Sequence, residues 1–276
     1  MSEALGTWID GVAGAQVPAD DRGLQYGDGV FETVLIRRGI PRFLAVHRAR
    51  LGRGLHQLGI PFEADAELNA EIAAAAAMAP ALAILKVIVT RGSARRGYAP
   101  GGEIRARRIV SLWHATPLAD EVVTRGAVLD VAKLRVPEFS PFAGLKHLNR
   151  LENVMAAREI SGGDAFEALL LDGHERVVSG ISCNVFIVRA GVVLTPPVDR
   201  TGVAGVMRQI VLREAPRLGI AAREQVLALE DVWSADGMFI TNARMGVVPV
   251  RRVREHAFGM TEIANRLRNA IEALDA

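Results

Sequence analysis

The sequence is poor in lysine. Only three of its 33 basic residues are lysines, namely Lys86, Lys133 and Lys146. Arginine keeps its proton in proteins, whereas lysine can become a neutral amine and form an imine with a carbonyl. Lys86 and Lys133 lie in apolar runs that predict solvent-facing strand positions, but Lys146 follows a loop rich in proline and glycine, where functional groups are often placed. Lys146 is therefore the candidate catalytic residue, and the alternative is a surface lysine at the start of a helix.

Cysteine, blocks of like charge and long apolar runs are also scarce. The single Cys183 excludes a disulfide within the chain, and six histidines without paired ligand spacing argue against zinc. The 33 basic and 31 acidic residues are spread evenly, so we expect no nucleic-acid partner. The N-terminus lacks the pattern of a signal peptide, and the longest uncharged apolar run, residues 72–85, is too short to span a bilayer. The sequence thus predicts a cytoplasmic protein with neither a metal nor a membrane partner.

Two short motifs come close to known enzyme signatures but are incomplete. Residues 180–184 resemble a nucleophile elbow, yet the closing glycine is missing and no helix is predicted to follow. Residues 27–32 have the first two glycines of a dinucleotide-binding motif without the third, and they precede a strand instead of a helix. Neither a serine hydrolase nor a nicotinamide-dependent enzyme is supported.

Hydrophobic spacing predicts an α+β fold, with strands in runs and helices between them. The predicted helices cover residues 43–58, 65–78, 148–160, 205–218 and 260–274. The predicted strands cover residues 8–11, 30–36, 83–90, 107–114, 122–134, 166–172, 176–178, 184–189, 192–195, 222–227, 237–241 and 247–253, and residues 20–29 are predicted as a glycine-rich loop. We expect two domains, residues 1–116 and 122–276, joined by a linker over residues 117–121.

A possible anion site accompanies the lysine. Gly205 lies at a predicted helix start, where free backbone amides and the helix dipole favour an anion, although an ordinary helix cap has the same pattern. Arg50 lies at the edge of the apolar stripe of its helix; such an arginine is usually solvated, but it could hold a phosphate through two hydrogen bonds. A reactive lysine and a phosphate site are the minimum that pyridoxal phosphate needs.

Longer motifs resemble a known family. They lie at residues 21–33, 47–51, 167–172, 184–186, 194–197 and 205–208. Over about residues 9–250 the sequence resembles the fold-type IV pyridoxal-phosphate enzymes, which include branched-chain aminotransferases, D-amino-acid transaminases and aminodeoxychorismate lyases. Residues 144–152 and the loop at 91–98 look most like the lyases. The resemblance implies a smaller N-terminal α/β domain, a larger cofactor-binding C-terminal domain with a mixed, barrel-like sheet and helices, and a homodimer.

The resemblance also implies roles for single residues. Lys146 would hold pyridoxal phosphate as an imine and then transfer a proton as the base. The other implied cofactor-binding residues are Arg50, Ser179, Asn184, Val206, Met207, Asn242 and Ala243. The candidates for binding substrate are Tyr26, Arg96, Tyr98 and Asn149.

Ser179 departs from the family pattern, because many members carry a glutamate there that keeps a proton on the pyridine nitrogen. A serine hydroxyl is neutral and can only hydrogen-bond the nitrogen. An elimination that forms an aromatic ring would tolerate this better than transamination. The implied reaction is the conversion of 4-amino-4-deoxychorismate to 4-aminobenzoate and pyruvate, a step of folate biosynthesis. The alternatives are a transaminase of the same fold that acts on D- or branched-chain amino acids, and a non-catalytic protein that binds a phosphate-bearing ligand.

Overall fold

The computed structural model describes residues 4–101, 103–259 and 262–274. The chain divides into two compact units. The first consists of the described residues up to Thr116 together with Leu145–Asn149, and the second of Pro117–Gly144 and the described residues from Arg150 onward. The five residues around Lys146 therefore belong to the first unit, although the chain on both sides of them belongs to the second.

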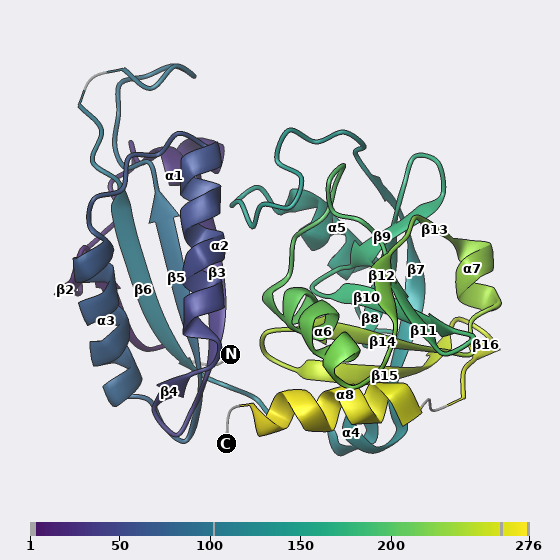
Figure 1. Cartoon of the computed structure of the whole chain (residues 1–276). Coiled ribbons are helices and arrows are strands. Elements are labelled where there is room, and N and C mark those ends of the chain that lie inside the picture. Colours follow the sequence, from purple (N-terminus) through teal and green to yellow (C-terminus); the bar gives the residue numbers. More distant parts are fainter. Residues whose placement is uncertain (1–3, 102, 260–261, 275–276) are drawn as a thin grey trace. The chain divides into compact units, whose positions relative to one another are not determined.

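The first unit is built on an antiparallel six-stranded sheet of order β2-β1-β6-β5-β3-β4 (Figure 1). Its strands are β1 (Ala4–Ile9), β2 (Val12–Ala13), β3 (Gly29–Arg37), β4 (Ile40–Pro41), β5 (Leu82–Thr90) and β6 (Arg107–His114). In β5 the side chains of every second residue are buried, which is the period of a strand with one face on a core. Helices α2 (Leu44–Gln57) and α3 (Asp65–Ala77) cover that face, and a short helix α1 (Arg22–Tyr26) precedes β3.

Helix α2 forms because its leucines recur at helical spacing. Leu51 and Leu55 are buried against β3 and β5, and Gly54 allows the helix to approach the sheet closely, since a Cβ there would lie 2.9 Å from the Val30 side chain. The chain turns after the helix at Gly59, which adopts a φ of 59°. This close packing of α2 on β3 brings polar residues of both elements together inside the first unit.

The second unit contains a mixed ten-stranded sheet, in which the order β12-β11-β10-β14-β15-β7-β8-β9-β13 is extended by β16 on β15. Its strands are β7 (Ala127–Val136), β8 (Glu167–Asp172), β9 (Arg176–Gly180), β10 (Asn184–Arg189), β11 (Val192–Thr195), β12 (Ala222–Glu224), β13 (Leu227–Ala228), β14 (Gly237–Asn242), β15 (Gly246–Val253) and β16 (His256–Ala257). Its helices are α4 (Asp120–Arg125), α5 (Leu151–Glu159), α6 (Val206–Arg217), α7 (Leu229–Trp233) and α8 (Glu262–Ala273). The stacked rings of Phe186 and Phe239, with centroids 4.8 Å apart, lie fully buried on β10 and β14.

The structure corrects three of the predicted elements. The strand predicted from Val122 begins only at Ala127, because residues 120–125 form α4, which has two acidic residues in its first turn. Residues 22–26 are helical instead of a loop, because the Asp21 side chain caps α1 by accepting from the Gly23 amide at 2.8 Å. Helix α5 begins at Leu151 and not at residue 148, so Lys146 does not open a helix. The helix predicted over residues 260–274 corresponds to α8, which is described from Glu262. Residues 260 and 261 of the prediction lie outside the described residues.

Candidate active site

Lys146 is held by its backbone against strand β3. The amide of Phe31 donates to the carbonyl oxygen of Lys146 at 2.9 Å, and the amide of Leu148 donates to the carbonyl oxygen of Gly29 at 3.0 Å. The Lys146 Nζ atom lies over the face of the Phe31 ring, 4.3 Å from its centroid. The candidate base is thus carried by an extended segment at the sheet of the first unit.

Three buried polar side chains lie on β3 and α2: Glu32, His47 and Arg50, which we call the Glu32 triad. Arg50 Nε donates to Glu32 Oε1 at 2.7 Å, and Arg50 Nη2 donates to Glu32 Oε2 at 2.5 Å. His47 Nδ1 lies 2.6 Å from Glu32 Oε2. A spacing of three residues puts His47 and Arg50 on one face of α2, and strand alternation gives Glu32 the same face as the core residues Val30 and Val34.

Mutual contacts set the protonation of the triad. Burial acts to raise the pKa of Glu32, but hydrogen bonds from Arg50 and His47 outweigh it and lower the pKa of this carboxyl. Burial lowers the pKa of His47 despite its bond to Glu32, and the charges of Arg50 and Lys146 add to the lowering. At neutral pH we therefore assign a carboxylate to Glu32 and a neutral imidazole to His47, with Nδ1–H donating to Glu32. The effect of Lys146 on His47 brings the candidate lysine and the triad into one electrostatic environment.

In the second unit, helix α6 begins at the position where the sequence predicts an anion site. No side chain caps the helix, and the position before its first residue is Gly205. A Cβ on Gly205 would lie 1.9 Å from Asn184 Oδ1, so a larger residue here would displace the Asn184 side chain or the helix start. Asn184 Nδ2 donates to the carbonyl oxygen of Val203 at 3.0 Å, which fixes the approach of the chain to the helix. The first amides of a helix, here those of Val206 and Met207, have no acceptor within the helix and favour an anion.

Ser179 is buried on β9. Its hydroxyl donates to the carbonyl oxygen of the adjacent Gly180 at 2.8 Å. The serine hydroxyl is neutral, and its proton is already donated to the Gly180 carbonyl oxygen.

Asn242, at the end of β14, uses its side chain within the turn to β15. Its Oδ1 accepts from the amides of Arg244 and Met245 at 3.0 and 2.9 Å, and its Nδ2 donates to the carbonyl oxygen of Ser182 at 3.3 Å. Asn242 and the following Ala243 can therefore offer mainly backbone groups to a ligand.

Glu167 is a buried carboxyl that sequence reasoning did not single out. It accepts from the amides of Ile181 and Ser182 at 2.8 and 3.0 Å and from the Ser182 hydroxyl, so it holds the turn between β9 and β10. Burial raises the pKa of Glu167. The sequence signal that could have identified Glu167 was its charge at the start of the otherwise apolar strand β8.

Three of the four candidates for binding substrate, Tyr26, Tyr98 and Asn149, lie in one part of the first unit. The rings of Tyr26 and Tyr98 have centroids 5.7 Å apart, and Asn149 Nδ2 donates to the carbonyl oxygen of Gly27 at 3.1 Å. Tyr98 is 87% exposed. Arg96 is also exposed and is not part of this group.

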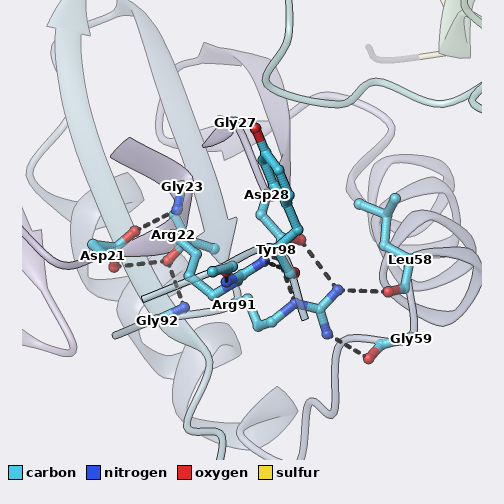
Figure 2. A network of polar contacts seen from close by, with 12 residues as sticks. Asp21, Arg22, Gly23, Gly27, Asp28, Leu58, Gly59, Arg91, Gly92 and Tyr98 are labelled. Atoms are coloured by element: carbon cyan, nitrogen blue, oxygen red, sulfur yellow. Dashed lines mark hydrogen bonds and ion pairs between the residues drawn. The ribbon is translucent and has the colours of Figure 1, made fainter. Parts of the chain in front are cut away.

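A network of arginines fixes the loop that carries Tyr98 (Figure 2). Arg22 donates to the carbonyl oxygens of Gly97 and Tyr98 at 2.8 and 2.7 Å, and its Nε donates to Asp28 at 2.9 Å. Arg91 donates to both oxygens of Asp28 and to the carbonyl oxygens of residues 58 and 59 after α2. These bonds hold down the pKa of Asp28 against the opposing effect of burial. The exposed Tyr98 side chain thus extends from a loop whose backbone is held by hydrogen bonds.

Over the described part of the chain, no three His, Cys, Asp or Glu side chains gather into a possible metal site. None of the helices described here combines the length and hydrophobicity that crossing a bilayer requires.

Comparison with known proteins finds relatives that match most of the chain, across both units. The amino-transferase class IV family matches residues 29–253. Aminodeoxychorismate lyase of Vibrio harveyi is 32% identical, over 88% of this chain and 89% of its own length. A putative branched-chain-amino-acid aminotransferase of Methanocaldococcus jannaschii is 33% identical, over 86% of this chain and 82% of its own.

A solved structure gives a further comparison. The crystal structure of 4-amino-4-deoxychorismate lyase from Pseudomonas aeruginosa superposes with a TM-score of 0.91 and 38% identity, covering 97% of this chain and 98% of that one. The predicted α+β fold of type IV is thereby confirmed, and so is the family resemblance drawn from the motifs.

Proposed function

Because the chain belongs to the amino-transferase class IV family, whose enzymes use pyridoxal phosphate, we propose that it is an aminodeoxychorismate lyase. It would convert 4-amino-4-deoxychorismate to 4-aminobenzoate and pyruvate, a step of folate biosynthesis. The observation that carries the proposal is the 38% identity to a solved lyase over 97% of the chain. The neutral Ser179 supports an elimination over a transamination.

The residues fit the cofactor. Gly205 leaves the start of α6 without a side chain, and no side chain caps the helix, so the first amides of α6 are open to an anion. In the second unit, Asn184 fixes the chain before α6. The first unit has a buried guanidinium at Arg50 and an amine at Lys146. We propose that Val206 and Met207 bind the phosphate through their amides and that Asn242 and Ala243 add backbone contacts. We also propose that the Ser179 hydroxyl oxygen accepts a hydrogen bond from the pyridine nitrogen when that nitrogen carries a proton.

Pyridoxal phosphate, when bound, withdraws electrons from the carbon that carries the substrate amine. Lys146 acts as the general base that takes the proton from this ring carbon. Loss of the proton lets the carbon–oxygen bond of the enolpyruvyl ether break, so that enolpyruvate leaves and the ring becomes aromatic. Enolpyruvate then gains a proton at its methylene carbon to become pyruvate, which balances the proton taken up by Lys146. The ring of Phe31 lies beneath the Lys146 Nζ atom and holds the amine in one position. Tyr26, Tyr98, Asn149 and Arg96 are the proposed contacts of the substrate.

The test combines a spectrum with a product assay. The purified chain should show the visible band of a lysine-bound pyridoxal cofactor, borohydride should fix the cofactor to Lys146, and the aminated chorismate should yield pyruvate and 4-aminobenzoate. Lys146→Ala should lose the band and roughly 10³-fold or more of the rate, the scale for removing a catalytic base. Lys133→Ala, an exposed lysine of β7, is the matched control and should keep both. Cofactor binding without the two products would contradict the lyase assignment.

A transaminase is the second candidate, favoured by the 33% identity to a putative branched-chain-amino-acid aminotransferase. Branched-chain and D-amino acids would then convert the bound cofactor rapidly to its pyridoxamine form. Following that conversion with a panel of amino acids separates the two activities.

We further propose that the protein acts in the cytoplasm as a homodimer, in which the exposed Tyr98 loop reaches the partner. Light scattering should give a mass of twice 29.7 kDa. A mass of one chain at micromolar concentration would contradict the dimer.

A further inference from the structure

The Glu32 triad points to a residue role beyond the cofactor contacts proposed above. We infer that Glu32 is a positioning residue: it orients the guanidinium of Arg50 for the phosphate of the cofactor, and His47 fixes Glu32 in turn. This rests on the proposed role of Arg50 in phosphate binding. It does not depend on which reaction the enzyme performs.

The geometry of the pair determines the direction of Arg50. Arg50 uses Nε and Nη2 to reach the two oxygens of Glu32, so the carboxylate occupies one edge of the planar guanidinium. Two parallel bonds fix the plane as well as the distance. The direction in which the other edge, between Nη1 and Nη2, can meet an anion is therefore set by Glu32.

His47 removes the remaining freedom of the carboxylate. Its Nδ1 lies 2.6 Å from Glu32 Oε2, the same oxygen that Arg50 Nη2 contacts. Since His47 is neutral at neutral pH, it orients Glu32 without adding a positive charge that would compete with Arg50 for the carboxylate. The triad then has no net charge, which permits its burial before the phosphate arrives.

The elements that carry the triad are the same ones that hold the candidate base. Glu32 is the next residue after Phe31, whose amide bonds to the Lys146 carbonyl and whose ring lies under Nζ. Lys146 is contacted by the backbone and the ring of Phe31, so a side-chain change at Glu32 acts on Arg50 and leaves the lysine in place.

The experiment compares two ligands that differ only by the phosphate. Apo protein of the full chain is titrated with pyridoxal phosphate and with pyridoxal, and the absorbance of bound ligand gives each dissociation constant. Glu32→Gln should weaken pyridoxal phosphate by roughly ten- to a hundredfold, the scale for losing hydrogen bonds to a charged group, and leave pyridoxal within about twofold. Glu32→Asp, which keeps the charge but withdraws it from Arg50, should give a smaller loss of the same kind.

The matched control is Glu71, whose carboxylate pairs with the buried Arg108 through Nε and Nη2 at 3.0 and 2.8 Å in the same unit. Glu71→Gln removes a similar ion pair between α3 and β6 and should leave both dissociation constants unchanged. Equal losses for the two ligands in Glu32→Gln, or a similar loss in Glu71→Gln, would overturn the positioning role, because either result indicates a general structural effect.

A double-substitution cycle separates this inference from the assignment on which it rests. Arg50→Ala should also weaken pyridoxal phosphate selectively, and Glu32→Gln should add little in the Arg50→Ala background. Full additivity overturns the role of Glu32. An Arg50→Ala protein that binds pyridoxal phosphate normally overturns the phosphate role of Arg50 instead. Absence of lyase products from a protein that passes these binding tests would count only against the proposed reaction.

Discussion

At the scale of single residues, Ser179 decides how strongly a bound cofactor can withdraw electrons. Its hydroxyl donates to the Gly180 carbonyl oxygen, so only lone pairs of a neutral oxygen remain for another group. A carboxylate in its place would favour a protonated ring nitrogen.

We therefore expect amino acids to convert the cofactor to its pyridoxamine form faster in Ser179→Glu, by roughly tenfold or more. This is the effect of a one-unit change in the pKa of the pyridine nitrogen. Stopped-flow absorbance with alanine and leucine measures this rate. Ser182→Ala, which removes a nearby hydroxyl bonded to Glu167 instead, is the control. A collapse of lyase activity in Ser179→Glu with no gain in transamination would count against the electron-withdrawal argument.

Glu32 makes stability depend on pH. The pKa of its carboxyl is lower in the fold than the ordinary value of 4.5, so the unfolded state binds the proton more tightly. The stabilisation is therefore complete above about pH 4.5 and is lost as the pH falls through the lower pKa of the folded state. The free energy of unfolding of Glu32→Gln should be about 3 kcal/mol lower at pH 7, because the variant removes the carboxylate that pairs with the buried Arg50. The stability of the variant should also fall less steeply in acid. Urea unfolding from pH 7 to pH 3 measures both effects, and parallel curves for the two proteins would refute the second.

At the scale of elements, the start of α6 depends on Gly205. An alanine Cβ would meet Asn184 Oδ1 at 1.9 Å, so the helix start or the Asn184 side chain must move. We expect Gly205→Ala to weaken pyridoxal phosphate at least about tenfold and to lower stability by about 1–3 kcal/mol, the cost of overpacking. Gly219→Ala, after the other end of the helix where a Cβ meets nothing, serves as a control for glycine replacement, although its φ of 72° makes it mildly destabilising. Unchanged cofactor affinity in Gly205→Ala would contradict an anion site at this helix start.

The sequence predicted regular elements well where one packing face produced the pattern. The helix predicted over residues 43–58 is α2 within one residue at each end, because its leucines face a single sheet. The helix start at residue 148 was wrong: Leu148 is apolar because it packs beside Gly29, in an extended segment, and not because it belongs to a helical stripe. Helix α4 was missed because the β-branched Val122 and Val123 suggested a strand, whereas acidic residues at its start and Gly126 at its end set the helix.

The candidate site shows the same division between local and long-range information. Arg50 and Gly205 could be selected from local spacing and a helix start. The pairing of Arg50 with Glu32 joins residues 18 apart in different elements, so no local pattern contains it. The backbone pairing of Lys146 with Phe31 is more distant still and depends on the fold of the first unit.

At the scale of the whole molecule, removal of the cofactor should lower thermal stability. A ligand that binds only the folded state stabilises it by about 2.7 kcal/mol at one hundred times its dissociation constant. For a chain of this size that corresponds to a rise of about 5–10 °C in the melting temperature. Calorimetry of the full chain with and without pyridoxal phosphate measures the shift, and Lys146→Ala should show a smaller one. Equal melting temperatures for the wild-type protein in both conditions would argue against binding of the cofactor to the native fold.

The return of Leu145–Asn149 to the first unit has a consequence for dissecting the gene. A fragment that ends after Thr116 would encode every named strand of the six-stranded sheet and still lack the segment that pairs with β3 at Phe31 and Gly29. The lysine would remain on the other fragment, separated from the strand that holds it. The two units are therefore not interchangeable modules: an exchange of the first unit between relatives must carry residues 145–149 from within the sequence of the second, and an exchange of the second must leave them behind.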